Sequence, residues 1–222
     1  MSLIVAVISR EGGVVASDGR RFNSTDVNFE TGKAIRPATI ATDDFDKTFA
    51  LDGGRIIGVA CGLLEFSGQT IAQHLTSIRE TCSDGNEFTE LIEEISIGMS
   101  ARLREVDEAE VATKARLVDI IVAGRSKISR GNVTMASMRI KPSDQDIHIQ
   151  ERYCYGGDEE GKLGASRVLS RDYAGNRGTK ALTQIAERAI KAGIVVSGAH
   201  QYGGGKTCGG GPFLRVMAPA AS

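Results

Sequence analysis

The order of strand-like and helix-like segments constrains the fold of this chain more than any single motif. Strand patterns and helix patterns come in runs: four strands before residue 62, then helices over 64–80 and 88–103, strands over 117–124, 132–140 and 147–155, helices over 159–169 and 179–192, and a last strand over 213–217. Such runs argue against the alternation of a doubly wound parallel sheet. We therefore expect an α+β protein. Its predicted form is a four-layer αββα sandwich of two antiparallel sheets flanked by helix pairs, in one domain over 1–222.

Turn residues and apolar spacing support the individual elements. Residues 2–18 form two strands joined by a turn, and residues 47–62 form a second hairpin that turns at 52–54, Asp-Gly-Gly. The helix over 179–192 places Leu182, Ile185 and Ile190 on one face, and Gly193 is positioned to end it.

Composition excludes several classes of function. The 222 residues are 41% hydrophobic, which is enough for a full core, and the net charge is −1. No Lys or Arg run offers a surface for nucleic acid or an anionic membrane. The N-terminus lacks the features of a signal peptide and no apolar run has the length of a membrane span, so we expect a soluble, cytoplasmic protein. The four cysteines are spaced singly, which favours reduced thiols over a disulfide framework, and no metal-ligand cluster or cofactor motif is present.

The first residue after the initiator methionine carries a hydroxyl. Removal of Met1 would be easy before the small Ser2, and it would leave a nucleophile and a free amine on one residue. Such an amine titrates near ~7.7–8.0 in water, so it could accept the serine proton at neutral pH. The three histidines, His74, His148 and His200, lie in no recognisable triad context, and an N-terminal nucleophile needs none.

Five short motifs, in this order, resemble the proteasome β-subunits and their bacterial relatives. They are the hydroxyl-initiated strand, the Gly-Gly turn at 12–13, Val-Val-Ala-Ser-Asp-Gly-Arg at 14–20, Lys-x-Phe-x-Leu at 47–51, and Gly-Val-Ala-Cys-Gly at 58–62. The likeness is best over 2–75 and looser over 119–124 and 179–194. The chain is thus similar to proteasome-type N-terminal-nucleophile hydrolases, which implies the sandwich fold and acyl-transfer chemistry.

The resemblance implies a set of catalytic residues. Ser2 stands in place of the usual threonine nucleophile, and Asp18 falls at the expected spacing of sixteen residues. Lys47 corresponds best to the family lysine, because it leads the strand that runs into the Gly62 turn, and Lys33 is the competitor. The lysine ammonium would keep the amine neutral, and Asp18 would hold that ammonium charged and oriented.

The same resemblance implies the substrate contacts and the setting of the site. The backbone N–H of Gly62 would bind the developing oxyanion, and Ala60 and Arg20 would border the substrate. The expected substrate is a peptide or unfolded protein, within a homo-oligomer of rings, stacked rings or an open helical assembly and with an ATPase as a further partner.

The second half of the chain departs from the family pattern. Ile194 stands where the family often has aspartate before the serine corresponding to Ser197, and Asp158 follows the glycine turn where family members carry serine. Two alternatives to a peptidase therefore remain open. One is a structural or scaffold subunit without catalysis, and the other is an acylase of small amides on the same fold.

Overall fold

The computed structural model describes residues 2–22, 39–82, 87–108, 110–111, 116–125, 132–173, 178–197 and 208–218. Its elements are β1 (Leu3–Ile8), β2 (Gly13–Ser17), β3 (Arg21–Phe22), β4 (Ile40–Thr42), β5 (Thr48–Leu51), a 3₁₀ turn (Asp52–Gly54), β6 (Ile56–Gly62), β7 (Glu65–Phe66), β8 (Gln69–Thr70), α1 (Ile71–Thr81), α2 (Phe88–Glu105), β9 (Val118–Arg125), β10 (Val133–Ile140), β11 (Gln145–Gln150), β12 (Tyr153–Gly157), α3 (Glu159–Asp172), α4 (Thr179–Val196) and β13 (Phe213–Val216).

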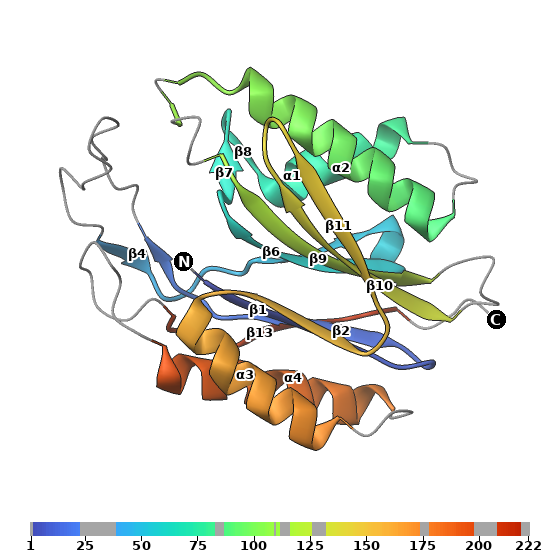
Figure 1. Cartoon of the computed structure of the whole chain (residues 1–222), viewed down its shortest axis with the longest axis vertical. Coiled ribbons are helices and arrows are strands. Elements are labelled where there is room, and N and C mark those ends of the chain that lie inside the picture. The colour runs from blue at the N-terminus through green and yellow to red at the C-terminus, as the bar shows by residue number, and fades with distance from the viewer. Residues whose placement is uncertain are drawn as a thin grey trace.

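These elements build the predicted αββα sandwich. One sheet has the order β12-β1-β2-β13, the other has the order β11-β10-β9-β6-β5, and neighbours in both are antiparallel. Helices α1 and α2 cover the five-stranded sheet, whereas α3 and α4 cover the four-stranded one (Figure 1). The fold class expected from the sequence is confirmed.

The continuous apolar run of β1 follows from its place inside the sandwich. Leu3, Val5 and Val7 pack into the core beneath α3 and α4, whereas the alternate residues, Ile4 among them, face the other sheet. Because both faces of β1 are buried, neither face needs polar side chains, and apolar and polar residues therefore do not alternate along it.

The predicted helix over 64–80 was wrong at its start. Residues 65–66 and 69–70 pair as the small hairpin β7–β8, and its turn has positive φ at Ser67 and Gly68. The helix begins at Ile71, where Thr70 and Gln73 form a capping box. The turn and cap signals at Gly68 and Thr70 therefore override the helical spacing of the apolar residues.

The predicted strand over 147–155 is in fact two strands in different sheets. β11 pairs with β10, whereas β12 pairs with β1, and the chain passes from one sheet to the other at residues 151–152. In Figure 1 this is the gold segment that leaves β11, turns and runs into α3. Periodicity alone does not reveal that crossing, because both halves have strand character.

Helix α4 runs past the expected end at Ala192. Gly193 lies inside the helix, which continues to Val196, and α3 likewise extends beyond 169 to Asp172. A Cβ at position 193 would meet the Leu3 side chain at 2.1 Å and the Gly161 carbonyl at 2.7 Å. The glycine is therefore required for close packing of α4 rather than for ending the helix.

Among the described residues, no helix is both long and apolar enough to cross a membrane.

Candidate active site

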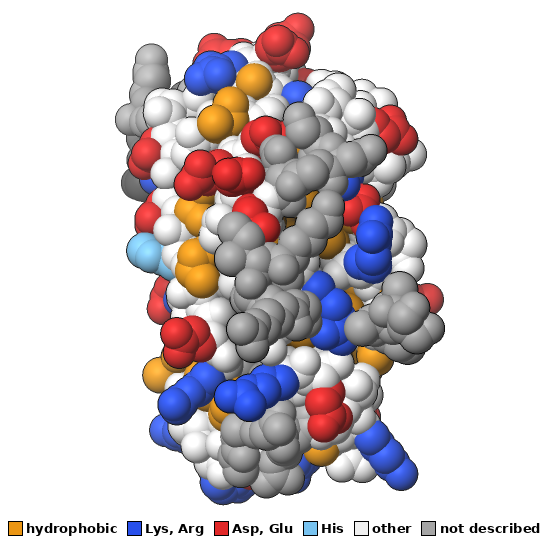
Figure 2. Space-filling model, turned by 90° about the vertical axis from the view of Figure 1, so that its right-hand side faces the viewer, with side chains coloured by type: hydrophobic (Ala, Val, Ile, Leu, Met, Phe, Trp, Pro, Cys, Tyr) orange, Lys and Arg blue, Asp and Glu red, His pale blue; other side chains and the backbone are white. Residues whose placement is uncertain are grey.

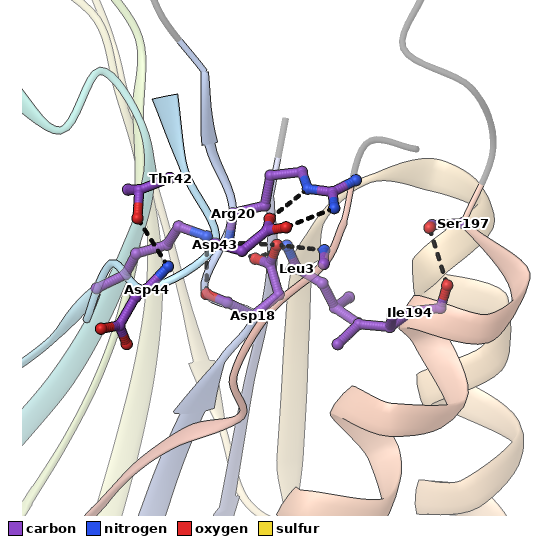
Figure 3. Close-up of polar contacts among 10 residues, drawn as sticks. Leu3, Asp18, Arg20, Thr42, Asp43, Asp44, Ile194 and Ser197 are labelled. Carbon is purple, nitrogen blue, oxygen red and sulfur yellow. Dashed lines mark hydrogen bonds and ion pairs between the residues drawn. The ribbon is translucent and has the colours of Figure 1, made fainter. Parts of the chain in front are cut away.

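Asp18 directly follows β2, lies beside the first residue of β1 and is fully buried. Its Oδ1 atom accepts a hydrogen bond from the Leu3 backbone N–H at 2.9 Å, and its own N–H donates to the Leu3 carbonyl at 3.0 Å. Figure 3 shows this contact beside the Arg20 and Asp43 side chains. The carboxylate is thus fixed one peptide bond away from Ser2, because the Leu3 nitrogen is bonded to the Ser2 carbonyl carbon.

Lys47 reaches the same carboxylate from the other sheet. It directly precedes β5, and its Nζ donates to Asp18 Oδ1 at 2.6 Å and to the Asp18 carbonyl at 2.8 Å. Both side chains have 0% exposure. Charges taken out of water are tolerated only when they are paired and hydrogen-bonded. The Lys47–Asp18 pair therefore forms the polar centre of this end of the sandwich.

The second oxygen of Asp18 binds backbone from two further segments. Oδ2 accepts from the N–H groups of Arg20, at 3.3 Å, and of Gly209, at 3.2 Å. With Leu3 and Lys47, the carboxylate thus has four donors and serves only as an acceptor. Gly209 lies 191 residues away in sequence. Its contact brings the C-terminal segment into the site, and no spacing rule in the sequence signals it.

Ser2 is 6% exposed, and its carbonyl is held by Asp158, which no motif of the sequence pointed to as a partner of Ser2. The Asp158 backbone N–H donates to the Ser2 carbonyl at 2.8 Å, and the buried Asp158 side chain caps α3 by accepting from Gly161 N–H at 2.7 Å. Gly157, with φ of +100°, makes the turn before it, and a Cβ there would lie 1.7 Å from the Ser2 carbonyl oxygen. The Gly-Gly-Asp sequence is therefore a signal for the segment that holds Ser2.

Gly62 lies at the end of β6, with φ of +94°. The Ala60 N–H donates to the Lys47 carbonyl at 3.1 Å, and the Leu63 N–H donates to the Leu117 carbonyl at 2.9 Å on the opposite side of the strand. Because N–H groups alternate in direction along a strand, that of Gly62 points to the Lys47 side. Ala60 itself is 2% exposed and packs with the core beneath α1 and α2.

The Arg20 guanidinium is engaged in an ion pair. It binds Asp43 through two hydrogen bonds, of 2.6 and 2.9 Å, and its side chain is 14% exposed (Figure 3). The side-chain hydrogen bond to Asp43 raises the pKa of Arg20 and lowers that of Asp43. A Cβ on Gly209 would lie 2.5 Å from the guanidinium carbon, so Arg20 packs flat on that backbone. In this arrangement Arg20 joins the end of β2 to two neighbouring segments.

The thiol of Cys61 also lies close to the ion pair. The thiol is buried between the sheets, and burial together with the negative charge of Asp119 raises its pKa to about 12. It stays protonated at neutral pH, and a thiol is a far weaker nucleophile than a thiolate. Within the described part of the chain, no group of three His, Cys, Asp or Glu residues could hold a metal ion.

The structure thus brings Ser2, Asp18 and Lys47 together, with Gly62 at the end of the adjacent strand. Of the expected substrate contacts, Arg20 is adjacent and paired with Asp43, and Ala60 is in the core. Lys33 and Met1 lie outside the described residues. Ser197 is buried at the end of α4, where its hydroxyl donates to the Ile194 carbonyl at 3.0 Å (Figure 3).

Comparison with solved structures identifies the architecture. The fold is similar to Anbu (ancestral beta-subunit) from Yersinia bercovieri, with a TM-score of 0.61 and 13% sequence identity, covering 98% of this chain and 82% of that chain. No protein-family model matches the sequence, and no curated protein matches it. The chain therefore has a proteasome-like fold.

Proposed function

We propose that this chain is a peptidase that uses Ser2 as an N-terminal nucleophile after removal of Met1. The observation that carries the proposal is the buried Lys47–Asp18 pair, whose carboxylate also binds the N–H of the residue after Ser2. A buried ion pair is weak evidence for stability, because packed apolar residues serve a core equally well. Its placement beside a terminal hydroxyl and amine gives it a chemical use.

The reaction would be acyl transfer in two steps. The Ser2 hydroxyl attacks the substrate carbonyl carbon, and its proton passes through the terminal amine to the leaving nitrogen as the C–N bond breaks. Water then attacks the resulting ester, with the amine as base, and releases the acid and the serine. The Lys47 ammonium favours the neutral amine by charge repulsion. The Gly62 N–H would stabilise the oxyanion in both steps.

The proposal includes assembly of several copies around confined substrate. Large apolar side chains are exposed on both helix layers: Ile97 on α2 is 55% exposed, Leu163 on α3 is 61% exposed, and Val195 on α4 is 71% exposed. On the face shown in Figure 2, acidic side chains dominate the α1–α2 half, whereas Lys and Arg dominate the α3–α4 half. Layers of opposite charge favour contact between different surfaces of successive copies, which generates rings or filaments. Unfolded protein would be the substrate, and an ATPase would supply it.

A scaffold subunit without catalysis is the second candidate. It is favoured by the low exposure of Ser2, at 6%, and by the use of Arg20 in an ion pair with Asp43. In that role the Lys47–Asp18 pair would only join the two sheets. Retention of Met1 would mark it, because an acylated Ser2 nitrogen is no base.

Intact-mass measurement and covalent labelling separate the two candidates. We expect protein purified from cells to lack Met1 and to gain one adduct when treated with a peptide β-lactone, which acylates activated hydroxyl groups. Ser2→Ala should abolish the adduct. The matched control Ser9→Ala, at the other end of β1, should keep it, since Ser9 is equally buried at 7% exposure. Retained Met1 with no adduct would leave the scaffold subunit as the function.

A further inference from the structure

A cleft of about 210 Å³ opens between the two sheets beside the site. On one side of the cleft lies β12, the edge strand of its sheet, and on the other side lie residues of β9, β10 and β11 from the five-stranded sheet. Residues of five strands and of α3 line the cleft: Ile4 of β1, 119–121 of β9, 137–139 of β10, Asp146 and His148 of β11, Cys154–Gly157 of β12, and Lys162.

No strand in the described parts of the chain pairs with the outer edge of β12, although the Tyr155 carbonyl accepts from the Cys154 thiol at 3.9 Å. The Asp158 N–H donates to the Ser2 carbonyl and the Ile8 N–H donates to the Arg152 carbonyl, so even-numbered residues of this segment bond to β1. Because backbone groups alternate along a strand, those of Tyr153, Tyr155 and Gly157 point outward.

The sequence of this edge suits it to accept another strand. Exposed edges are normally protected by charges, proline or a covering element. β12 reads Tyr-Cys-Tyr-Gly-Gly, without charge or proline, whereas the neighbouring edge strand β11 carries Asp146 and His148. Gly156 and Gly157 add no side chain of their own at the inner end of the cleft, where the Ile4 side chain lies against Gly156.

The inner end of the cleft lies next to the segment that holds the proposed nucleophile. Gly157 pairs with Leu3, and the next residue, Asp158, holds the Ser2 carbonyl. A peptide paired with the outer edge of β12 would therefore lie two strand spacings from β1, and one of its ends would lie level with Ser2. That separation is about 9–10 Å at the usual spacing of strands.

We propose that the free edge of β12 binds an extended peptide as an added strand, and that this peptide is the part of the substrate beyond the scissile bond. This inference rests on the proposed function, which makes Ser2 the nucleophile and so places the scissile bond at the Ser2 end of β12. Backbone pairing of this kind gives affinity without a strict sequence requirement.

The walls of the cleft favour recognition of backbone over side chains. Arg139 binds Asp119 through hydrogen bonds of 2.8 and 3.2 Å, and Lys162 binds Glu159 at 2.6 Å. The charges of Arg139, Asp119 and Lys162 are thus already paired, and Asp146, which also lines the cleft, accepts a hydrogen bond from His148 at 3.1 Å. A strand from a second folded copy would bring its own covering layers, for which this cleft has no room, so a single extended chain is the better occupant.

Binding to the full-length Ser2→Ala chain tests the site without catalysis. The probe is a fluorescein-labelled decapeptide of alternating Ser and Thr, followed by fluorescence anisotropy. N-methylation of one peptide nitrogen at a time removes one donor. We expect roughly tenfold weaker binding at every second position and little change at the positions between, because only alternate groups face β12.

Two protein variants test the location. Ser137→Trp fills the cleft and should weaken peptide binding at least tenfold, whereas Ile149→Trp, on an exposed neighbouring position outside the cleft lining, should not. Equal losses at all N-methylated positions, no binding, or binding unchanged by Ser137→Trp would overturn the edge site. Displacement of the peptide by dimerisation of the chain, seen in sedimentation, would make a second copy the occupant.

Activity distinguishes failure of this inference from failure of the proposed function. If the wild-type chain cleaves a short amide with no residues beyond the scissile bond, and Ser137→Trp slows only longer peptides, both hold. If cleavage of long and short substrates is equally unaffected, the peptidase stands and the edge site is wrong. If the peptide binds with the alternating pattern but nothing is cleaved, the edge site stands and the peptidase is wrong.

Discussion

The Lys47–Asp18 ion pair should have a measurable effect on stability that is independent of catalysis. Replacing Lys47 with Met leaves the Asp18 carboxylate buried without its counter-ion, which typically costs about 3–5 kcal/mol. Adding Asp18→Asn removes that charge and should restore part of the loss. Urea unfolding of both single variants and the double variant would measure a coupling of about 1–3 kcal/mol. Additive effects would show that the two groups do not interact as the structure indicates.

We expect the buried residue His74 to make stability depend on pH. Its Nδ1 accepts from Arg102 Nη1 at 2.9 Å and its Nε2 donates to the Phe66 carbonyl at 3.1 Å, with the Phe66 ring stacked on it. Burial chiefly, with the Arg102 charge, lowers the pKa of His74, while the Phe66 carbonyl and Glu110 oppose the shift.

Below about pH 6.5 the unfolded chain therefore takes up a proton that the folded protein resists. The free energy of unfolding should fall as pH drops from 7 through this range, by at most about 1.4 kcal/mol per pH unit for one group. Urea titrations between pH 7.5 and 5 measure the slope. His74→Gln should reduce it, and His148→Gln, at an exposed position, should not. An unchanged slope in His74→Gln would assign the pH dependence to other groups.

The resemblance to proteasome β-subunits singled out Asp18 and Lys47, and it could not single out the backbone groups that bind them and Ser2. Asp18 and Lys47 each lie at a strand end whose position follows from local sequence, and the structure joins them. Asp158 and Gly209 contribute backbone N–H groups, which every residue except proline possesses. The Gly-Gly-Asp sequence marks the segment of Asp158, whereas nothing in residue type marks Gly209, which only the tertiary fold brings to the site. Whether these residues act in catalysis stays a prediction.

At the scale of elements, the turn that joins β12 to α3 sets the position of Ser2. Gly157 combines φ of +100° with a Cβ position 1.7 Å from the Ser2 carbonyl oxygen, whereas Gly53 has φ of +66° and open space around it. Gly53→Ala should cost about 1–2 kcal/mol, from backbone conformation alone. Gly157→Ala should cost about 3 kcal/mol or more, because the turn must also move.

Thermal unfolding and the β-lactone reaction measure the two consequences of this change. Gly157→Ala should also abolish the adduct at Ser2, since displacement of the Ser2 carbonyl moves the hydroxyl. Gly53→Ala, in the hairpin between β5 and β6, should react at the wild-type rate. Equal costs in the two variants would mean that the β12–α3 turn relaxes freely and does not position Ser2.

The elements show where sequence patterns are sufficient. The order of strands and helices predicted the sandwich, because each layer must bury one apolar face. Boundaries failed where local chemistry competed with periodicity, as at the Thr70 cap, or where packing decided, as at Gly193 against Leu3. The division of 147–155 between two sheets failed for a third reason, since both halves are equally strand-like and only the sheet pairing separates them.

At the scale of the whole molecule, the two helix layers differ in charge. Helices α1 and α2 carry more acids than bases: Glu80, Glu90, Glu93, Glu94 and Glu105 against Arg79, Arg102 and Arg104. Helices α3 and α4 carry more bases than acids: Lys162, Arg167, Arg171, Lys180, Arg188 and Lys191 against Glu159, Glu160, Asp172 and Glu187. Exposed Ile97 and Leu163 lie within these layers. A contact between the layers of successive copies would pair opposite charges around an apolar centre.

We therefore expect the chain to assemble, and Leu163→Glu to reduce the assembly. The substitution removes exposed apolar area and places a negative charge where an acidic layer would dock, so the dissociation constant should rise at least tenfold, or about 1.4 kcal/mol. Light scattering after gel filtration would measure the mass, with Ile149→Glu on β11 as the control that keeps it, and circular dichroism would confirm folding of both. Because rim charges are screened, the mass should also fall between 0.05 and ~0.5 M salt. A monomer under all conditions would contradict self-assembly, whereas equal loss in both variants would place the contact elsewhere than on the helix layers.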